Sequence, residues 1–567
     1  MCFQKKSELI KKENILAIRV SGNPYEIGFQ HGELLKEYVK DGVYKYFSGY
    51  IVSLIKNDKR IKAQPLLKLA LKFLQSKSQK FINRVPLDLR EEIRGLADGS
   101  QINYATAQEV FVLPEIISYL VNKFSGENYA YKTHLSGASI MGCTSIVAMS
   151  EATQNKELLH GRNFDFMGID AWDKYPLVSY VYPDKCFSYI SIGSVGLSGG
   201  VITAINEKQI SYALHQNYTK EFSENNLPIL ALGNLIMKYA DDLDKAKEII
   251  LSSKSNSGWS VIISDNKSKT AFIAEICADK VIIRDIETDL LVYTNSYLAP
   301  EFHEKEIVIS PPLNISSNIR FQRINQLAAK DYFNITPENI IAYLGDRYDT
   351  TSEKERVYGY SISQNHTVAS VVFAPDRNTF WLASGKTPVC NNKYLAFSFD
   401  FEQMKKNNLP TIEGHKFTKD TDNQALKLIM ESNTEYEAHQ FEKSLKCMLK
   451  ASKLCGNEEP NMYYLSGMLY IKLYNFEKSF KYLQLAYDHE QDIYKSGVIK
   501  LWLGRLADLT DRRDKAVKHY RYVEQMDRNI YHEIYELAKK GIRKPYNKKS
   551  IKYINLAIWY GEELVAK

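Results

Sequence analysis

Cys143 is the residue of this sequence whose neighbours best suit chemistry. It begins a strand-like run that continues through residues 145–149, and a second such run, after a polar turn, carries Arg162 and Asp165. If the two runs pair as an antiparallel hairpin, Cys143 lies opposite about Phe164. Arg162 and Asp165 then lie close to the sulfur. The spacing therefore predicts a cysteine between a cation and a carboxylate, which is not a cysteine–histidine pair.

The thiol proton of Cys143 needs an acceptor, and one solution is for the cysteine to become a chain terminus. A free α-amine has an unperturbed pKa of roughly 7.7–8.0 and lies within reach of its own side chain. Gly142 suits cleavage before Cys143, because a residue without Cβ tolerates a strained peptide and leaves room for the thiol to attack. Asp165 could orient the new amine, and Arg162 could bias the local field. A cysteine that starts a strand is more often a core residue, so the wider sequence has to decide.

The sequence pattern changes along the chain. Residues 25–133 have a helical spacing of apolar residues. Residues 136–400 contain short β-branched and aromatic runs between Gly, Asn and Asp turns, with helical segments at 228–252 and 320–344. Strand runs separated by long helices predict a layered α/β or α+β domain. The polar residues 405–422 are interpreted as a linker.

Residues 423–567 are helical in pattern and internally repetitive. Gly467 and Gly504 recur with a 37-residue step. Three further sets recur at offsets of 35 and 37 residues: Ser444, Met448 and Ala451; Ser479, Leu483 and Ala486; and Ala516, Tyr520 and Val523. A small residue where two helices cross, with larger residues one and two turns on, is typical of a tetratricopeptide-like hairpin. Because the expected Trp and Pro are mostly missing, an unrelated helical bundle stays the alternative.

Composition argues against several classes of protein. Lys and Arg number 74 against 67 Asp and Glu, a net charge of +7 spread over the chain, so no nucleic-acid partner is expected. No run approaches the ~18 apolar residues of a membrane span, and the first twelve residues lack the apolar core of a secretion signal. Seven cysteines without a CxxC pair argue against disulfides or structural zinc. We expect a cytoplasmic protein of two or more domains without a metal.

An ordered set of motifs lies within residues 15–398. In chain order the motifs are residues 22–32, 91–99, 142–144, 161–165, 203–207, 214–216, 294–296 and 316–320. Each is weak alone, but in this order they resemble the family of acyl-coenzyme A:6-aminopenicillanic acid acyltransferase. This is a group of autoproteolytic cysteine peptidases and acyltransferases among the N-terminal-nucleophile hydrolases. The resemblance implies a four-layer αββα sandwich, here followed by the helical repeats.

The resemblance also implies a role for Cys143 and its immediate partners. Cys143 is the nucleophile after cleavage of the bond between Gly142 and Cys143, and Asp165 steadies its amine. Asn295 donates its side-chain amide to the oxyanion, helped by a backbone N–H at Asn206. Such donors are typically worth ~3 kcal/mol of the barrier.

Two arginines and two histidines complete the candidate residues. Arg320 is expected to support the site electrostatically or to meet the polar end of the substrate. Arg162 matches the distantly similar choloylglycine hydrolases. His215 and His366 are equally consistent with satisfied core histidines and with site residues.

The predicted domains are a helical segment 1–142, released by cleavage but kept in the fold, a nucleophile-bearing domain 143–404, the linker 405–422 and the repeats 423–567. The predicted reaction cleaves an amide or thioester and passes the acyl group through a thioester on Cys143 to water or an amine. No cofactor is expected, and acyl-coenzyme A is a candidate acyl donor. The repeats could bind a protein partner or a second copy. The alternative is a non-catalytic interaction protein whose sandwich is a scaffold.

Overall fold

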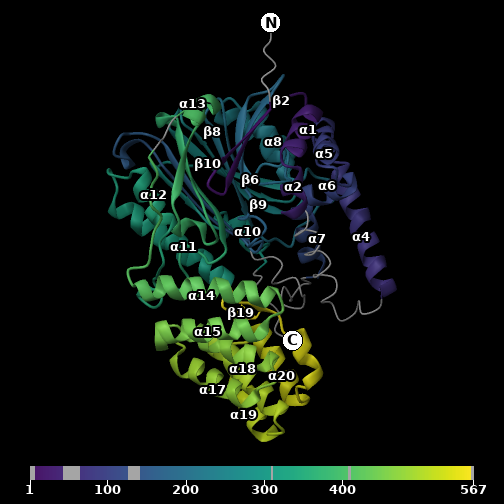
Figure 1. Cartoon of the computed structure of the whole chain (residues 1–567), viewed down its shortest axis with the longest axis vertical. Helices are drawn as coiled ribbons and strands as arrows, with labels where there is room; N and C mark the ends of the chain where they lie inside the picture. Colours follow the sequence, from purple (N-terminus) through teal and green to yellow (C-terminus); the bar gives the residue numbers. More distant parts are fainter. Residues whose placement is uncertain (1–6, 43–63, 125–140, 308–310, 407–409, 564–567) are drawn as a thin grey trace. The chain divides into compact units, whose positions relative to one another are not determined.

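The computed structural model describes residues 7–42, 64–124, 141–307, 311–406 and 410–563. The chain divides into two compact units, whose elements are labelled in Figure 1. The first contains residues 1–309, 314–346 and 362–415, and the second contains residues 310–313, 347–361 and 416–567. All residues predicted to form the site belong to the first unit.

The larger sheet of the first unit has nine strands in the order β1-β2-β5-β6-β7-β8-β9-β10-β11. β2 and β5 run parallel, and the other neighbours are antiparallel. The strands are β1 Glu8–Lys12, β2 Ile15–Gly22, β5 Pro176–Pro183, β6 Tyr189–Ser194, β7 Thr203–Asn206, β8 Ile210–Gln216, β9 Gly258–Asp265, β10 Thr270–Cys277 and β11 Lys280–Asp285. Strands β7, β8 and β9 are buried along their whole length, as expected for a sheet covered on both faces.

The smaller sheet has six strands in the order β12-β3-β4-β15-β16-β17, and all its pairs are antiparallel. The strands are β12 Leu290–Tyr293, β3 Met141–Ala148, β4 Leu159–Phe166, β15 Thr367–Ala374, β16 Thr379–Ala383 and β17 Tyr394–Ser398. β3, which carries Cys143, lies between β12 and β4. The nucleophile is therefore predicted on an interior strand of this sheet.

The two sheets pack face to face, and helices cover their outer sides (Figure 1). Ile15, Val178 and Ile205 of the larger sheet share one apolar cluster with Val371 and Phe380 of the smaller sheet. The larger sheet is covered by α1 Pro24–Leu34, α5 Leu87–Ser100, α8 Ile229–Tyr239 and α9 Leu243–Ser253, and the smaller sheet by α11 Pro311–Lys330 and α12 Pro337–Leu344. The predicted four-layer αββα sandwich is confirmed.

Two of the sequence motifs form one helix–helix contact. Motif 22–32 contains α1, and motif 91–99 lies in α5. A Cβ added to Gly28 would lie 1.9 Å from the carbonyl oxygen of Glu92, and one added to Gly95 would lie 2.1 Å from that of Tyr25. The glycines therefore allow the two helix backbones to touch, which no larger residue would permit.

The beginning of the chain differs from the predicted helical segment 1–142. Residues 8–22 form β1 and β2, and β2 pairs with β5 from beyond the predicted cleavage point. Ile15, Ala17 and Ile18 are fully buried, so sheet packing determines the structure of this stretch. Helices follow: α2 Lys36–Asp41, α4 Gln64–Ile82, α6 Tyr104–Phe111 and α7 Leu113–Phe124.

The second unit consists mainly of antiparallel helix pairs. They are α14 Asp420–Glu437 with α15 Phe441–Cys455, α16 Pro460–Lys472 with α17 Phe476–His489, and α18 Ile493–Leu509 with α19 Arg513–Glu524, followed by α20 His532–Arg543. A Cβ on Gly467 would lie 2.8 Å from Leu483, and one on Gly504 would lie 2.6 Å from Tyr520. The predicted close helix crossings at the two glycines are confirmed, and the assignment of the pairs to the tetratricopeptide type stays a prediction.

A segment from the middle of the sequence packs within the second unit. Residues 347–361 were predicted as part of the domain 143–404, but Val357 and Tyr358 belong to the apolar core of the helical unit. Arg356 forms a buried ion pair of 3.1 Å with Glu459, which also accepts the Val357 N–H at 2.6 Å. The predicted linker 405–422 also differs, because Ile412 forms a β-bridge with Tyr394 and residues up to 415 belong to the first unit.

A chain ended after Lys405 is therefore expected to keep self-cleavage at Gly142 but to expose residues 347–361 to protease. Burying a Val side chain such as that of Val357 is worth about 1.5–3 kcal/mol, and Arg356 would lose Glu459 as well. Limited proteolysis followed by peptide mass, with the full chain as control, measures this. Protection of residues 347–361 in the shortened chain would contradict it, and loss of self-cleavage in a folded shortened chain would show that the site needs the second unit.

Candidate active site

β3 and β4 pair in the register predicted from the sequence. Cys143 faces Phe164, and Gly142 faces Asp165. Arg162 faces the residue two positions after Cys143 and therefore lies on the same side of the sheet as the sulfur. The hairpin thus brings together the cysteine, the cation and the carboxylate that the spacing predicted, and this register is confirmed.

The Cys143 thiol is buried and lies between a guanidinium and a carbonyl. Arg162 Nη2 lies 3.4 Å from Sγ, and Sγ lies 3.6 Å from the carbonyl oxygen of Leu214. Arg162 donates to the Ile202 carbonyl at 2.9 Å and also to Thr203 Oγ1 and the Leu214 carbonyl. The opposite sheet therefore fixes this cation beside the sulfur.

Burial raises the pKa of the Cys143 thiol above its ordinary value. Arg162 and Arg320 lower this pKa and Asp165 raises it, but burial has the largest effect. The thiol is consequently protonated near neutral pH in the uncleaved chain. Nucleophilic attack by Cys143 needs a base that accepts its proton.

Asn295, just beyond β12, contacts the backbone nitrogen of Cys143. Its Oδ1 accepts the Cys143 N–H at 2.8 Å, and its Nδ2 donates to the Gln216 carbonyl at 3.0 Å. Its own backbone N–H donates to Ser317 Oγ at 3.0 Å. Asn295 thus reaches Cys143 as expected, but through its oxygen and not through its amide donor.

Arg320, on α11, is buried and binds the same group of atoms. Its Nη1 donates to the Cys143 carbonyl at 2.6 Å and to Thr144 Oγ1 at 2.7 Å. Its Nη2 donates to Asn295 Oδ1 at 3.0 Å. The geometry suits electrostatic support, because the guanidinium joins the start of β3 to the loop that carries Asn295.

Asp165 is fully buried beside Gly142. A Cβ added to Gly142 would lie 2.9 Å from Asp165 Oδ2, so the carboxylate fills the space that any larger residue would need. Thr367 Oγ1 donates to Asp165 Oδ1 at 2.6 Å. Since Gly142 supplies the carbonyl of the bond before Cys143, the carboxylate lies next to that peptide.

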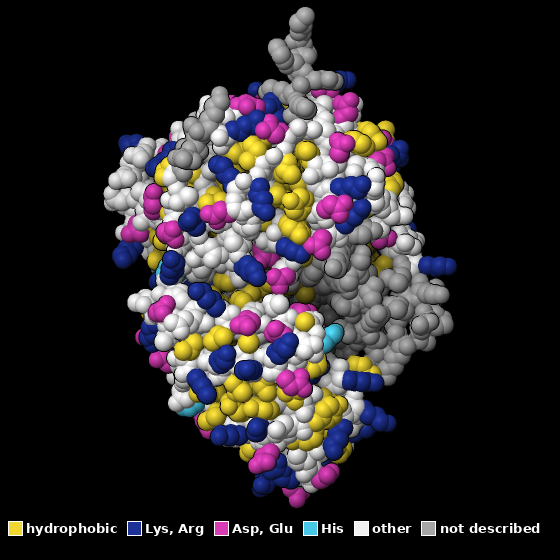
Figure 2. All heavy atoms as spheres, viewed as in Figure 1, with side chains coloured by type: hydrophobic (Ala, Val, Ile, Leu, Met, Phe, Trp, Pro, Cys, Tyr) yellow, Lys and Arg dark blue, Asp and Glu magenta, His cyan; other side chains and the backbone are white. Residues whose placement is uncertain are grey.

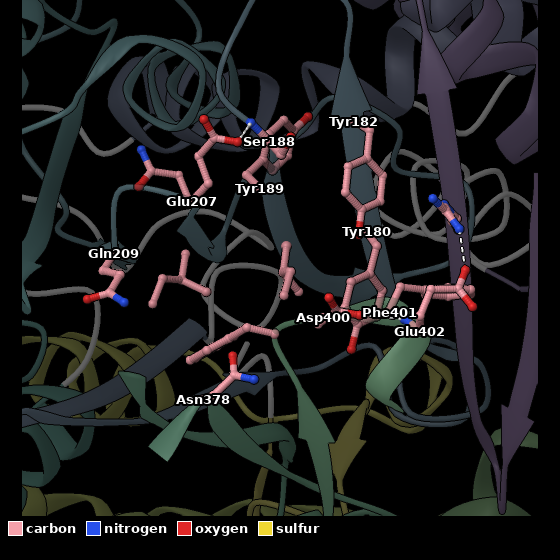
Figure 3. A pocket seen from close by; sticks show the side chains of 15 residues that line it. Tyr180, Tyr182, Ser188, Tyr189, Glu207, Gln209, Asn378, Asp400, Phe401 and Glu402 are labelled. Atoms are coloured by element: carbon pink, nitrogen blue, oxygen red, sulfur yellow. Dashed lines mark hydrogen bonds and ion pairs between the residues drawn. The ribbon is translucent and has the colours of Figure 1, made fainter. Parts of the chain in front are cut away.

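The structure does not bring Asn206 to Cys143, and this prediction is corrected. Arg162 contacts Thr203 at the start of β7, whereas Asn206 ends the strand, and three strand residues span roughly 10 Å. The Asn206 side chain donates to the carbonyls of Met237 and Ala240. It lines a separate cavity of about 350 Å³, seen in Figure 3 with Tyr180, Glu207 and Asp400 around it.

The two histidines differ in their relation to the site. His215 Nδ1 donates to the Thr294 carbonyl at 2.8 Å, and its Nε2 lies 2.8 Å from Ser145 Oγ. Burial lowers the pKa of His215 well below its usual value, so the neutral ring accepts from Ser145. His215 therefore joins β3 to the loop of Asn295. The buried His366 accepts the Phe166 N–H through its carbonyl at 2.9 Å.

Sequence reasoning missed several groups that orient the site. Thr203 and the Leu214 carbonyl hold Arg162, Ser317 holds Asn295, and Thr367 holds Asp165. Ser317 and Thr203 lie inside motifs, so their motifs could have drawn attention to them. Leu214 also lies inside a motif, residues 214–216, whereas Thr367 lies outside every motif because its position beside Asp165 depends on tertiary packing.

The described residues contain neither a group of three or more His, Cys, Asp or Glu side chains placed to hold a metal ion nor a helix long and apolar enough to cross a membrane. On the described part of the face in Figure 2, Lys and Arg side chains are interspersed with Asp and Glu.

Three curated proteins are similar to part of this chain. An uncharacterized protein of Archaeoglobus fulgidus is 26% identical over 321 residues, which is 50% of this chain and 51% of that protein. Two proteins of Dictyostelium discoideum, dcd1B and dcd1A, are 24% and 22% identical, over 48% and 51% of this chain and 52% and 67% of their own lengths. The chain thus spans about half the length of the first two relatives.

A solved structure, the Caenorhabditis elegans N-acylethanolamine-hydrolyzing acid amidase (NAAA) ortholog, matches with a TM-score of 0.31 and 16% identity, over 41% of this chain and 93% of that one. Among family models, the one described as Acyl-coenzyme A:6-aminopenicillanic acid acyl-transferase matches residues 152–388. The matched range includes Arg162, Asp165, Asn295 and Arg320 and begins after Cys143. The family resemblance predicted from the motifs is therefore confirmed over residues 152–388, which carry the sequence pattern of the acyl-coenzyme A:6-aminopenicillanic acid acyl-transferase family.

Proposed function

We propose that this protein is an autoproteolytic cysteine enzyme that passes an acyl group through a thioester on Cys143 to water or an amine. The observation that carries the proposal is that two side chains contact Cys143, one at its sulfur and one at its backbone nitrogen. Arg162 lies 3.4 Å from its sulfur, and Asn295 accepts from the backbone nitrogen that cleavage would release. A cysteine that only filled the core would need neither contact.

In the cleavage step, Cys143 Sγ adds to the carbonyl carbon of Gly142. The C–N bond breaks as the C–S bond forms, and the thiol proton moves to the released nitrogen. Water then hydrolyses the thioester, which leaves a carboxylate on Gly142 and a free thiol and α-amine on Cys143. Asn295 Oδ1 already accepts from this nitrogen, and Asp165 lies beside Gly142, so both are placed to hold the new amine.

In turnover, the α-amine takes the thiol proton as Sγ attacks the substrate carbonyl. The amine then gives that proton to the leaving group, and the acyl group stays on sulfur until water or an amine removes it. Arg162 stabilises the thiolate. Asn295 Nδ2 becomes an oxyanion donor if it exchanges the Gln216 carbonyl for the substrate, a contact worth ~3 kcal/mol of barrier.

Aromatic rings beside the nucleophile support an apolar acyl group. Phe164 faces Cys143 across the hairpin, its ring stacks on Phe166 at 5.8 Å, and Trp172 packs edge-on at 5.1 Å. All three residues are largely buried. An amide or thioester of an apolar acid, acyl-coenzyme A included, is therefore the proposed class of acyl donor.

Trapping the acyl-enzyme tests this proposal. A slow amide or thioester substrate is expected to leave one acyl adduct on Cys143, found by peptide mass after an acid quench. Cys143→Ala should carry no adduct, whereas the control Cys277→Ala, which removes another buried thiol, should carry the wild-type amount. An adduct on a different residue, or turnover by Cys143→Ala, would rule the mechanism out.

A further inference from the structure

The cavity of about 350 Å³ that Asn206 lines lies at the end of the sandwich away from Cys143 (Figure 3). Strand β15 begins beside Asp165 and ends at Ala374, roughly 20 Å further on. The turn that follows carries Asn378, which lines the cavity. The volume lies within the range of small-molecule sites, roughly 300–1,000 Å³. The chemistry proposed for Cys143 does not account for this remote cavity.

The inner walls of the cavity are apolar, and their polar atoms already have partners. Ile190 and Ile205 of the larger sheet line it and belong to one apolar cluster, against which Phe399 packs from just beyond β17. The Tyr180 hydroxyl donates to a backbone carbonyl at 2.7 Å, and the Asn206 amide donates to two more. These walls therefore favour the apolar part of a ligand.

Arg19, on β2, is a buried cation that lines the cavity. The residue is 6% exposed, and its guanidinium lies 5.2 Å from the ring centre of Tyr182 and 5.7 Å from that of Phe401. Its Nη1 donates to Glu402 at 2.5 Å, whereas its Nε, which is also buried, has no hydrogen-bond partner among the described atoms. A buried donor of a charged group costs stability when it is unsatisfied, so a ligand that brings an acceptor to Nε is favoured.

Three carboxylates at the rim of the cavity already have partners of their own. Glu207 accepts a backbone N–H at 3.2 Å, and Asp400 accepts the Glu402 N–H at 2.8 Å at the start of α13 Phe401–Lys406. Glu207 lies on one side of the cavity, and Asp400 and Glu402 lie on the other (Figure 3). None of the three binds Arg19 Nε. Because all three side chains are exposed, solvent and salt screen their repulsion of a ligand anion.

We propose that this cavity binds a small apolar carboxylate, which places its carboxylate on Arg19 Nε and its apolar chain against the inner walls. Glu402 keeps its contact with Nη1, so the guanidinium joins the two carboxylates. A dianion such as phosphate would meet the rim carboxylates with a single guanidinium to balance it, so a monoanion fits better. An amine of the same shape would place a second cation beside Arg19. This site does not depend on the function proposed for Cys143.

Hydrogen exchange of the full chain with octanoate tests the site, and octanamide is the uncharged control of the same length. Octanoate is expected to slow exchange in peptides that cover residues 15–22, 176–194 and 399–406. When this protection is titrated, octanamide should bind at least about tenfold more weakly, the size of one charge-assisted hydrogen bond. Protection confined to residues 141–166 would place the ligand at Cys143 and would overturn the proposal.

Variants of Arg19 test whether the carboxylate binds there. Arg19→Gln should bind octanoate and octanamide equally, whereas Arg94→Gln, at an exposed position on α5, should keep the wild-type difference. A thermal melt within a few degrees of wild type shows that each variant folds. Arg19→Met, which keeps an apolar stem between the rings of Tyr182 and Phe401, replaces Arg19→Gln if the latter unfolds.

Two further results would overturn the proposal. The first is absence of octanoate protection, or an unchanged difference between octanoate and octanamide in the folded Arg19 variant. The second is tighter binding of octylamine than of octanoate, which would assign the cavity to a cation attracted by the rim carboxylates.

Discussion

Replacing Cys143 by alanine is expected to keep the chain whole, whereas the wild-type chain is expected to divide between Gly142 and Cys143. The alanine variant lacks the sulfur that attacks the Gly142 carbonyl, so no thioester forms and no α-amine is released. The two wild-type pieces should copurify, because β2 from the first piece pairs in parallel with β5 of the second. Intact mass under denaturing conditions distinguishes one chain from two.

Two further variants separate the chemistry from the fold. The Cys447→Ala variant, changed on a helix of the second unit, should cleave itself between Gly142 and Cys143 as the wild type does. Cys143→Ser should divide more slowly, since a hydroxyl is a weaker nucleophile than a thiol at the same position. A wild-type protein that stays intact after long incubation and still turns over substrate would refute the terminal-amine mechanism, and division of Cys143→Ala would place the nucleophile elsewhere.

The hairpin of Cys143 could be predicted because its register depends on local sequence alone. A polar turn between two strand-like runs fixes which residues face each other, and a slip of one residue would turn every side chain to the other face. Cys143 and Phe164 accordingly face each other as expected. The same register predicted that Asp165 and Arg162 lie close to Cys143.

Contacts between distant segments could not be predicted in this way. Gly28 and Gly95 indicate tight packing in the sequence, but only the folded chain shows that their two helices contact each other. Asn206 was placed by resemblance, and its position at the far end of β7 follows from the path of the strand. The packing of residues 347–361 in the helical unit likewise depends on partners such as Glu459, about a hundred positions along the chain.

Asn295→Asp is expected to lower kcat by about 10²–10³ and to leave KM nearly unchanged. Aspartate keeps the oxygen that accepts from Cys143 N and from Arg320, so these two contacts should survive. It loses the N–H donor at Nδ2, which now binds the Gln216 carbonyl. A donor that meets the oxyanion only in the transition state affects kcat and not binding.

The comparison of Asn295→Asp with Asn295→Ala separates the two ends of this side chain. Alanine also removes Oδ1, which accepts the Cys143 N–H. Self-cleavage after Gly142 should therefore be slower in Asn295→Ala, whereas its rate in Asn295→Asp should be closer to that of the wild type. Asn318→Asp, at an exposed position on α11, introduces the same charge away from the nucleophile and should change neither rate. If Asn295→Asp turns over substrate at the wild-type rate while Asn295→Ala does not, Asn295 acts only through Oδ1 on the amine. A different group must then donate to the oxyanion. Arg320 is the first candidate, because it already donates to the Cys143 carbonyl.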